Sequence, residues 1–127
     1  MSTWKLQKLC YYSQAWSLAW TERPLFDEDF EAWSNGPVCP TLFRKHKGRF
    51  MISAEDLDTG DSSNLTEDQK DTINNVLESY GEKEPYDLRE QSHSEAPWKD
   101  ARGGLPDGAP CDNIITKDSM GAYYGSF

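Results

Sequence analysis

The residues best suited to covalent chemistry in this chain are three cysteines and two histidines, and they are widely spaced. Cys10 or Cys39 with His93 would supply a nucleophile and a base. Cys10, however, falls on the apolar stripe of a predicted helix, where a small buried thiol is the ordinary arrangement. A cysteine-dependent hydrolase is therefore the weaker alternative, and we expect no catalytic residue and no enzymatic activity.

A second pair of side chains capable of chemistry is His93 with Glu95, which could bind a metal ion or exchange protons. Two ligands are too few for a metal site, and the cysteines form no CxxC pair. The sequence also lacks a glycine-rich phosphate loop, an HExxH motif and a GxSxG motif. We therefore expect no metal and no cofactor, and we expect the ring nitrogens of His93 to hydrogen-bond to backbone in a tight turn.

The charge of the chain narrows the class of partner. Among 127 residues, 22 are acidic and 13 are Lys or Arg, which gives a net charge of -9. This charge repels a phosphate backbone and disfavours nucleic-acid binding. The exception is a basic run at 44–49, which we interpret as a solvated helix end rather than a contact with an acidic partner. The separated cysteines, the lack of a long apolar run and the lack of a secretory signal predict a cytoplasmic protein without a membrane segment.

The elements that must position these residues begin with a predicted helix over 4–20. Apolar groups cover more than half of its circumference: Leu6, Leu9, Cys10, Ser13 and Ser17 form a stripe that Tyr12, Trp16, Ala19 and Trp20 widen. Such a helix either lies centrally in the fold or is covered on a second side by a partner.

A chain reversal follows at Ser34-Asn35-Gly36-Pro37, where Asn and Gly tolerate positive φ and proline has a fixed φ. Before it, Phe30 and Ala32 alternate with Glu31 and Trp33, which permits a short strand. We predict a mainly α fold: a single compact helical domain over 1–127 with a small β element or hairpin near 26–38. An acidic, serine-rich segment at about 53–65 is predicted to be a flexible loop.

Further helices are predicted at 40–47, 67–80 and 85–91, with two short ones after them. The helix over 67–80 begins with the capping box Thr66-Glu67-Asp68-Gln69 and faces the core with Ile73, Val76, Leu77 and Tyr80. Ser94 is the preferred cap of the next helix, because Pro97 then falls among the free donors of the first turn. That helix is predicted to end at Gly103-Gly104, and Thr116 is predicted to cap a last helix that ends at 123–124.

Three blocks of this sequence resemble the signature of the Panacea domain of SocA-like antitoxins, formerly called phage-associated GepA-like proteins. The blocks are Leu6-Gln7-Lys8-Leu9 with Tyr11-Tyr12-Ser13-Gln14-Ala15-Trp16, then Glu31-Ala32-Trp33-Ser34-Asn35-Gly36-Pro37-Val38 after Pro24-Leu25-Phe26, and Ser92-His93-Ser94-Glu95-Ala96-Pro97-Trp98-Lys99. In two respects the chain departs from the family: Ser92 replaces the usual Thr, and the helix that often precedes the first block is missing. The motif residues expected to have structural roles are Leu6, Gln7, Lys8, Leu9, Tyr12, Asn35, Gly36, Pro37, His93, Ser94, Glu95 and Pro97.

This resemblance implies a protein that binds and neutralises a protein toxin encoded by a neighbouring gene, by stoichiometric contact. In the SocA branch it also implies an adaptor that presents the toxin to the ClpXP protease. The alternative is a proteolytic adaptor or a phage-encoded host-interaction protein, whose partner is a cellular protease or another host protein. A homo-oligomer is also compatible with the sequence.

Aromatic side chains are the candidates for partner contact, since exposed Trp and Tyr anchor many interfaces. The candidates are Tyr11, Trp16, Trp20, Trp33 and Trp98. For Trp16, Trp33 and Trp98, core packing is favoured over toxin contact. Tyr11 and Trp20 are predicted to face outward, and part of the first helix is predicted to be covered by a toxin or by a second copy of the chain.

Overall fold

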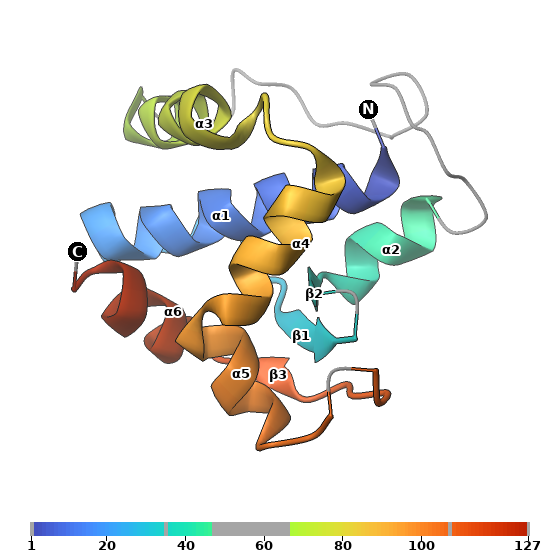
Figure 1. Cartoon of the computed structure of the whole chain (residues 1–127). Helices are drawn as coiled ribbons and strands as arrows, with labels where there is room; N and C mark the ends of the chain where they lie inside the picture. Colours follow the sequence, from blue (N-terminus) through green and yellow to red (C-terminus); the bar gives the residue numbers. More distant parts are fainter. Residues whose placement is uncertain (1, 35, 47–66, 107, 127) are drawn as a thin grey trace.

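The computed structural model describes residues 2–34, 36–46, 67–106 and 108–126. In these segments helices dominate and a small antiparallel sheet accompanies them, which confirms the predicted fold class (Figure 1). The helices are α1 (Thr3–Thr21), α2 (Pro40–His46), α3 (Glu67–Tyr80), α4 (Pro85–Ser94), α5 (Ala96–Arg102) and α6 (Lys117–Tyr124). The strands are β1 (Phe30–Trp33), β2 (Gly36–Val38) and β3 (Ile114–Ile115).

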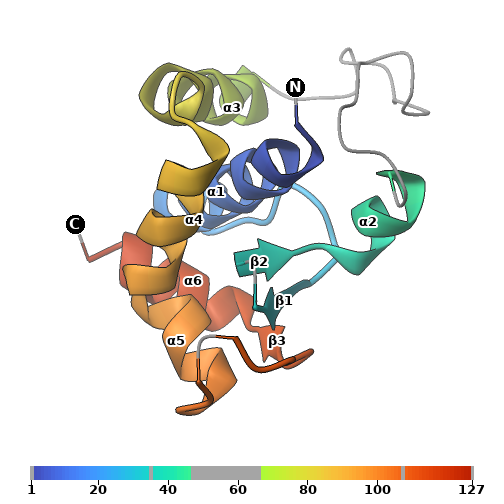
Figure 2. The same ribbon diagram turned by 45° about the vertical axis from the view of Figure 1, so that its right-hand side comes forward.

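Helix α1 is the centre of the fold, around which the other elements pack (Figures 1 and 2). Helix α3 lies on one side of it, the sheet and α6 lie on the opposite side, and α4 crosses it. The Ser2 hydroxyl caps α1 by accepting a hydrogen bond from the Lys5 backbone N–H at 3.0 Å. Neighbouring elements of the same chain therefore cover most of α1. Of the two arrangements expected for this helix, the structure shows mainly the first, in which the helix lies centrally in the fold.

The faces of α1 differ from the predicted stripe. Leu9, Tyr12, Ser13 and Ser17 are buried as expected, but Leu6 and Cys10 are only half-buried. Polar side chains take up the remaining interior positions, namely Gln7, Lys8 and Gln14. The stripe was partly wrong because a helix surrounded by other elements can bury polar groups, provided that each finds a partner.

The sheet has the strand order β2-β1-β3, with both pairs antiparallel. Glu31 pairs with Val38 and Trp33 with Gly36, so the predicted reversal forms a hairpin. Phe30 and Ala32 are buried and their alternating neighbours are half-buried, as predicted. Strand β3 was not predicted, because two residues carry too short a pattern to be recognised without their partner strand.

Helices α2 and α3 match the predicted positions; α2 is described as far as His46, and residue 47 lies outside the described residues. Val76 and Tyr80 face the core as expected, but Leu77 is 45% exposed, so its predicted inward orientation was wrong. Thr72 is buried instead, so α3 presents a row spaced by four residues to α1. Gly48, Thr66 and the predicted flexible loop at 53–65 lie outside the described residues.

The junction between α4 and α5 differs from the predicted cap. Helix α4 continues to Ser94, whose exposed hydroxyl donates to the Gln91 carbonyl at 2.7 Å. Glu95 takes the N-cap position of α5 with extended backbone and makes no side-chain cap bond. The Ser94 cap was wrong because the chain breaks one residue later, at Glu95, whose carboxylate points into the core. Gly103 (φ 64°) ends α5 and the Thr116 hydroxyl caps α6, both as predicted.

Candidate functional site

Two glutamines of the first signature block tie α1 to the chain that follows it. The Gln7 amide donates to the Cys39 carbonyl at 3.3 Å and accepts from the Cys39 N–H at 2.9 Å. The Gln14 amide donates to the Phe26 carbonyl at 2.9 Å and accepts from the Leu25 N–H at 2.7 Å. Each side chain thus pairs with backbone as a neighbouring strand would, and together they fix both ends of the segment that carries the hairpin.

Lys8, from the same block, lies against the turn of the hairpin. Its side chain is 1% exposed, and its Nζ lies 3.5 Å from the Pro37 carbonyl oxygen and 5.5 Å from the centre of the Trp4 ring. Burial, with a contribution from Arg89, lowers the pKa of Lys8 to about 7. Gly36 has φ +113°, and a Cβ there would lie 2.5 Å from Lys8 Cε. The first and second blocks are therefore matched to each other; Asn35 lies outside the described residues.

Glu95 of the third block accepts hydrogen bonds from two tyrosines. The Tyr12 hydroxyl lies 2.6 Å and the Tyr124 hydroxyl 2.8 Å from its Oε1. Burial raises the pKa of Glu95, while these hydrogen bonds act in the opposite direction. The cluster joins α1, the α4–α5 junction and α6, so Glu95 is a structural centre.

Tyr11 lies in the same aromatic core and was predicted wrongly to face outward. Its ring is 1% exposed, and its hydroxyl oxygen lies 3.2 Å from that of Tyr124, within hydrogen-bond distance. The ring centre of Phe30 lies 5.4 Å from its own, in an edge-to-face arrangement. Tyr11 therefore cannot touch a partner without opening of the core, and we remove it from the candidate contacts.

His93 and Trp98 form a stacked pair behind the hairpin, with ring centres 3.9 Å apart and an angle of 11° between the rings. Trp98 is 2% exposed and its indole N–H donates to the Trp33 carbonyl at 2.9 Å, so Trp98 is a core residue. Pro97, in the first turn of α5, is also buried.

The three cysteines are free thiols, and Cys10 and Cys39 line one cavity of about 230 Å³. Burial raises the pKa of Cys10 to about 12, so this thiol stays protonated at neutral pH and lacks the activation of a nucleophile. In the described part of the chain, no three His, Cys, Asp or Glu side chains converge on a possible metal position. Likewise, none of the helices seen there is long and apolar enough to span a membrane.

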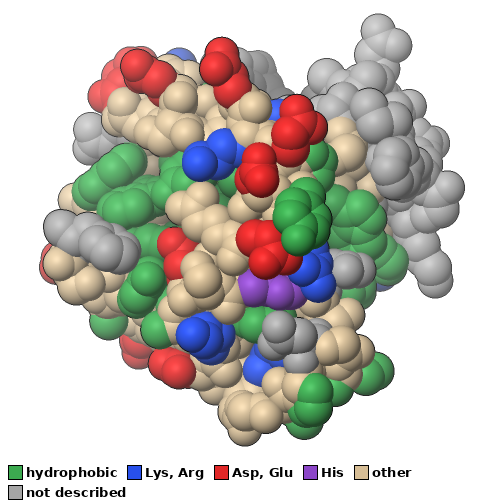
Figure 3. Space-filling view, viewed as in Figure 1, with side chains coloured by type: hydrophobic (Ala, Val, Ile, Leu, Met, Phe, Trp, Pro, Cys, Tyr) green, Lys and Arg blue, Asp and Glu red, His purple; other side chains and the backbone are tan. Residues whose placement is uncertain are grey.

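The most exposed of the candidate aromatic residues is Trp20, near the end of α1, at 52%. Its ring stacks on Trp16 with centres 5.1 Å apart, and the Trp16 N–H donates to the Tyr80 hydroxyl at 3.0 Å. Trp16 also packs against Tyr124 of α6, at 5.3 Å. We call Trp16 and Trp20 the aromatic face. Hydrophobic side chains gather on the surface where this half of α1 passes between α3 and α6 (Figure 3).

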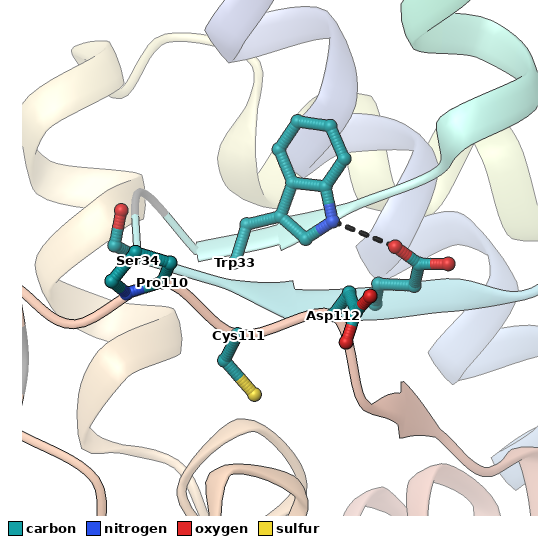
Figure 4. A pocket seen from close by; sticks show the side chains of 6 residues that line it. Trp33, Ser34, Pro110, Cys111 and Asp112 are labelled. Atoms are coloured by element: carbon teal, nitrogen blue, oxygen red, sulfur yellow. Dashed lines mark hydrogen bonds between the residues drawn. The ribbon is translucent and has the colours of Figure 1, made fainter.

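A second surface feature is an open pocket of about 540 Å³ beside β1. Its lining is formed by Glu31, Trp33, Ser34, Pro110, Cys111 and Asp112. The Trp33 indole rises from the strand and its N–H donates to the Glu31 carboxylate at 2.8 Å, while the chain at 110–112 runs alongside (Figure 4). We call this cavity the β1 pocket.

Of the five predicted contact residues, the structure leaves Trp16, Trp20 and Trp33 accessible at the surface and buries Tyr11 and Trp98. The accessible three do not meet: two form the aromatic face and one lines the β1 pocket. Glu31 and Asp112 were not predicted from the sequence as pocket residues. Glu31 had a detectable pattern, because it lies two residues before Trp33 and so shares its side of the strand, whereas Asp112 reaches the pocket only through the fold.

A family model described as antitoxin SocA-like, Panacea domain, matches residues 6–99 of the chain. This span contains all three blocks and extends from the first residues of α1 into α5. No curated protein and no solved structure matches the chain.

Proposed function

Since this chain belongs to the SocA-like antitoxin family with a Panacea domain, we propose that it binds and neutralises a cognate protein toxin by stoichiometric contact. The observation that carries this proposal is the family match, which covers about three quarters of the chain, residues 6–99 of 127. We propose further that the toxin gene lies beside the gene for this chain. The protein then acts in the cytoplasm, where the toxin is made, and it needs neither a cofactor nor a catalytic residue.

The aromatic face is the contact that we assign to the toxin. The signature side chains Gln7, Lys8 and Glu95 are buried and bonded within the chain, so they position elements and leave contact to exposed groups. Trp20 is half-exposed yet held by stacking on Trp16, which is itself hydrogen-bonded. A large ring that is already ordered loses little conformational entropy on binding, as is typical of interface anchors.

The charge of the molecule supports the same proposal. At a net charge of -9, the chain attracts a basic protein and accelerates the encounter with it. The groove between α1 and α6, of about 480 Å³, adds two exposed carboxylates, that of Glu22, two residues after Trp20, and that of Asp118 of α6. Lys117 also lines this groove, but its ammonium is paired with Asp29 at 2.8 Å. A basic toxin surface with an apolar centre fits this combination.

Co-expression with the product of the neighbouring gene tests the proposal. We expect that gene to be toxic alone, to be tolerated in the presence of this chain, and to give a complex that co-purifies. A harmless neighbour, or a toxic one that neither binds this chain nor is neutralised by it, would contradict the antitoxin function.

The assignment of the aromatic face is tested in the same complex. Trp20→Ala should weaken toxin binding by at least about tenfold, because anchor residues of this type are worth about 2 kcal/mol or more. Tyr86→Ala is the matched control, since Tyr86 is 67% exposed but lies on α4. Equal binding by both variants would move the contact away from α1.

Neutralisation could also proceed by delivery of the bound toxin to a ClpXP-type protease, as the SocA branch of the family suggests. Toxin lifetime separates the two routes: delivery shortens it in cells with an active protease, whereas direct blocking leaves it unchanged. Recovery of a cellular protease or another host protein, with no toxin, would instead support the host-interaction alternative. Association of the chain with itself would assign the aromatic face to a homo-oligomer.

A further inference from the structure

We propose that the β1 pocket receives an arginine side chain of the toxin, which stacks on the Trp33 indole and pairs with the carboxylates of Glu31 and Asp112. This inference rests on the proposed function, because it assigns a second contact to the same partner. It goes beyond that function in naming the chemistry that the antitoxin recognises, a guanidinium, and the place where recognition occurs.

The lining of the pocket has the composition of a cation site. Trp33 is half-buried and provides an aromatic wall, and indole is the strongest ring partner of a cation. Glu31 and Asp112 provide two carboxylates from different segments, and Pro110 adds an apolar surface. A volume of about 540 Å³ is ample for a guanidinium with its aliphatic stem.

No positive charge of the described segments neutralises these carboxylates. The ion pairs between described residues are Glu67–Lys70, Arg89–Glu90 and Asp29–Lys117, and neither Glu31 nor Asp112 takes part in one. Arg102 approaches the hairpin, but its guanidinium donates to the backbone carbonyls of Ala32, Pro106 and Ala109. As far as the described residues go, the two carboxylates of the pocket are therefore left for a cationic partner to compensate.

The walls of the pocket are fixed before any partner binds. Arg102, 3% exposed, bridges β1 to Pro106 and Ala109 through bonds of 2.9, 2.7 and 2.6 Å. Trp98 donates to the Trp33 carbonyl, and Phe43 packs edge-on against the Trp33 ring at 5.0 Å. Because these bonds already order the walls of the cavity, little conformational entropy is lost on binding. Its few polar groups are therefore in place to discriminate between ligands.

The geometry favours arginine over lysine. A guanidinium is planar, so it can stack on an indole while its N–H groups reach carboxylates at the edge of the ring. Glu31 stands in that position, because its Oε1 already accepts the indole N–H. An ammonium would meet the carboxylates as a point charge and, although it is also attracted to the indole, it could not stack flat on the ring or pair with a carboxylate through two parallel N–H groups.

A small-molecule probe tests the pocket independently of any toxin. N-acetyl-arginine amide should shift the NMR resonance of the Trp33 indole N–H, which Trp33→Phe identifies among the five tryptophans. The uncharged isostere N-acetyl-citrulline amide should leave it unchanged, and the double variant Glu31→Gln, Asp112→Asn should no longer respond to arginine. Equal shifts with the two amides, an undiminished shift in the double variant, or no shift with the arginine amide would overturn the proposal.

Measurement of toxin binding provides a second test of the pocket. Asp112→Asn should weaken binding by about tenfold and reduce its dependence on salt, since a charge-assisted contact is lost. Asp87→Asn is the matched control, because Asp87 is an exposed carboxylate on α4. If the wild-type chain binds the neighbouring gene product and Asp112→Asn binds equally well, the pocket inference fails while the antitoxin function stands. If the wild-type chain does not bind, the antitoxin function fails, and the arginine amide alone decides the chemistry of the pocket.

Discussion

At the scale of single residues, side chains of the family signature make contacts within the chain that stabilise the fold. Lys8 and Gly36 illustrate this, because the lysine stem occupies the space that any side chain at position 36 would need. Read within its own block, Gly36 indicates only a turn, and the block of Lys8 gives no sign of what that lysine contacts. A sequence pattern can therefore identify the motif, whereas the reason for each residue becomes clear only when two distant blocks are seen in contact.

Gly36→Ala should destabilise the fold, because a Cβ would lie 2.5 Å from Lys8 Cε and φ is +113°. We expect the free energy of unfolding to fall by more than about 1 kcal/mol, as for other side chains placed at positive φ against neighbours. Chemical denaturation measures it. Gly103→Ala is the control, since φ there is +64° but nothing lies within 4 Å of the added atom. A smaller loss at Gly36 than at Gly103 would refute the steric match.

The buried Lys8 should make stability depend on pH. The unfolded chain keeps the Lys8 proton up to the ordinary pKa of 10.5, whereas the folded chain releases it above a pKa of about 7. Between these values the unfolded state binds more protons, so stability rises with pH, by up to about 1.4 kcal/mol per unit. Denaturation at pH 7 and pH 9 measures this slope. We expect Lys8→Met to reduce it, and an unchanged slope would show that Lys8 is not its source.

At the scale of elements, the sequence predicts α1, the β1–β2 hairpin and α3 well, since each has its own pattern of caps, turns or spacing. The inner face of α1 was harder to predict. Gln7, Lys8 and Gln14 look like solvated positions in a helical pattern, but each has a specific bonding partner inside the molecule. Tyr11 was assigned to the surface for the same reason: periodicity shows one buried face, whereas a central helix has several.

Substitutions at two positions of α1, one in the core and one on the surface, should differ in their effect on stability. Leu9 is 5% exposed in the core, so Leu9→Ala should lower the free energy of unfolding by about 2 to 5 kcal/mol. Trp20→Ala removes a ring that is 52% exposed and stacked on Trp16, and it should cost at most about 1.5 kcal/mol. Thermal and urea unfolding of the two variants provide the comparison. Equal losses of stability would place the Trp20 ring in the folding core and remove it as an anchor.

At the scale of the whole molecule, the three signature blocks meet around α1. The first block forms the helix, the second the hairpin bound to it, and the third the α4–α5 junction whose Glu95 reaches Tyr12. Such convergence explains why the blocks occur together in one family. The proposed contact surfaces are built differently: Asp112 joins Glu31 and Trp33 only in space, so spacing along the chain could not predict the β1 pocket.

The net charge of the molecule leads to a prediction about rates. Long-range attraction between a chain of charge -9 and a basic toxin acts before contact, so it accelerates association more than it slows dissociation. We expect the association rate constant to fall by about tenfold or more as salt rises from about 0.05 M to 0.5 M, since the screening length shortens over that range. Stopped-flow mixing with the purified toxin measures both rate constants.

Trp20→Ala provides the contrast in that experiment, because it removes a short-range contact and leaves the charge unchanged. Its effect should appear in the dissociation rate constant, as for most interface substitutions, while its association rate keeps the wild-type response to salt. The two results together would assign encounter to the whole acidic molecule and retention to the aromatic face. An association rate insensitive to salt would mean that the toxin is not basic, which would contradict the charge argument for both the aromatic face and the β1 pocket.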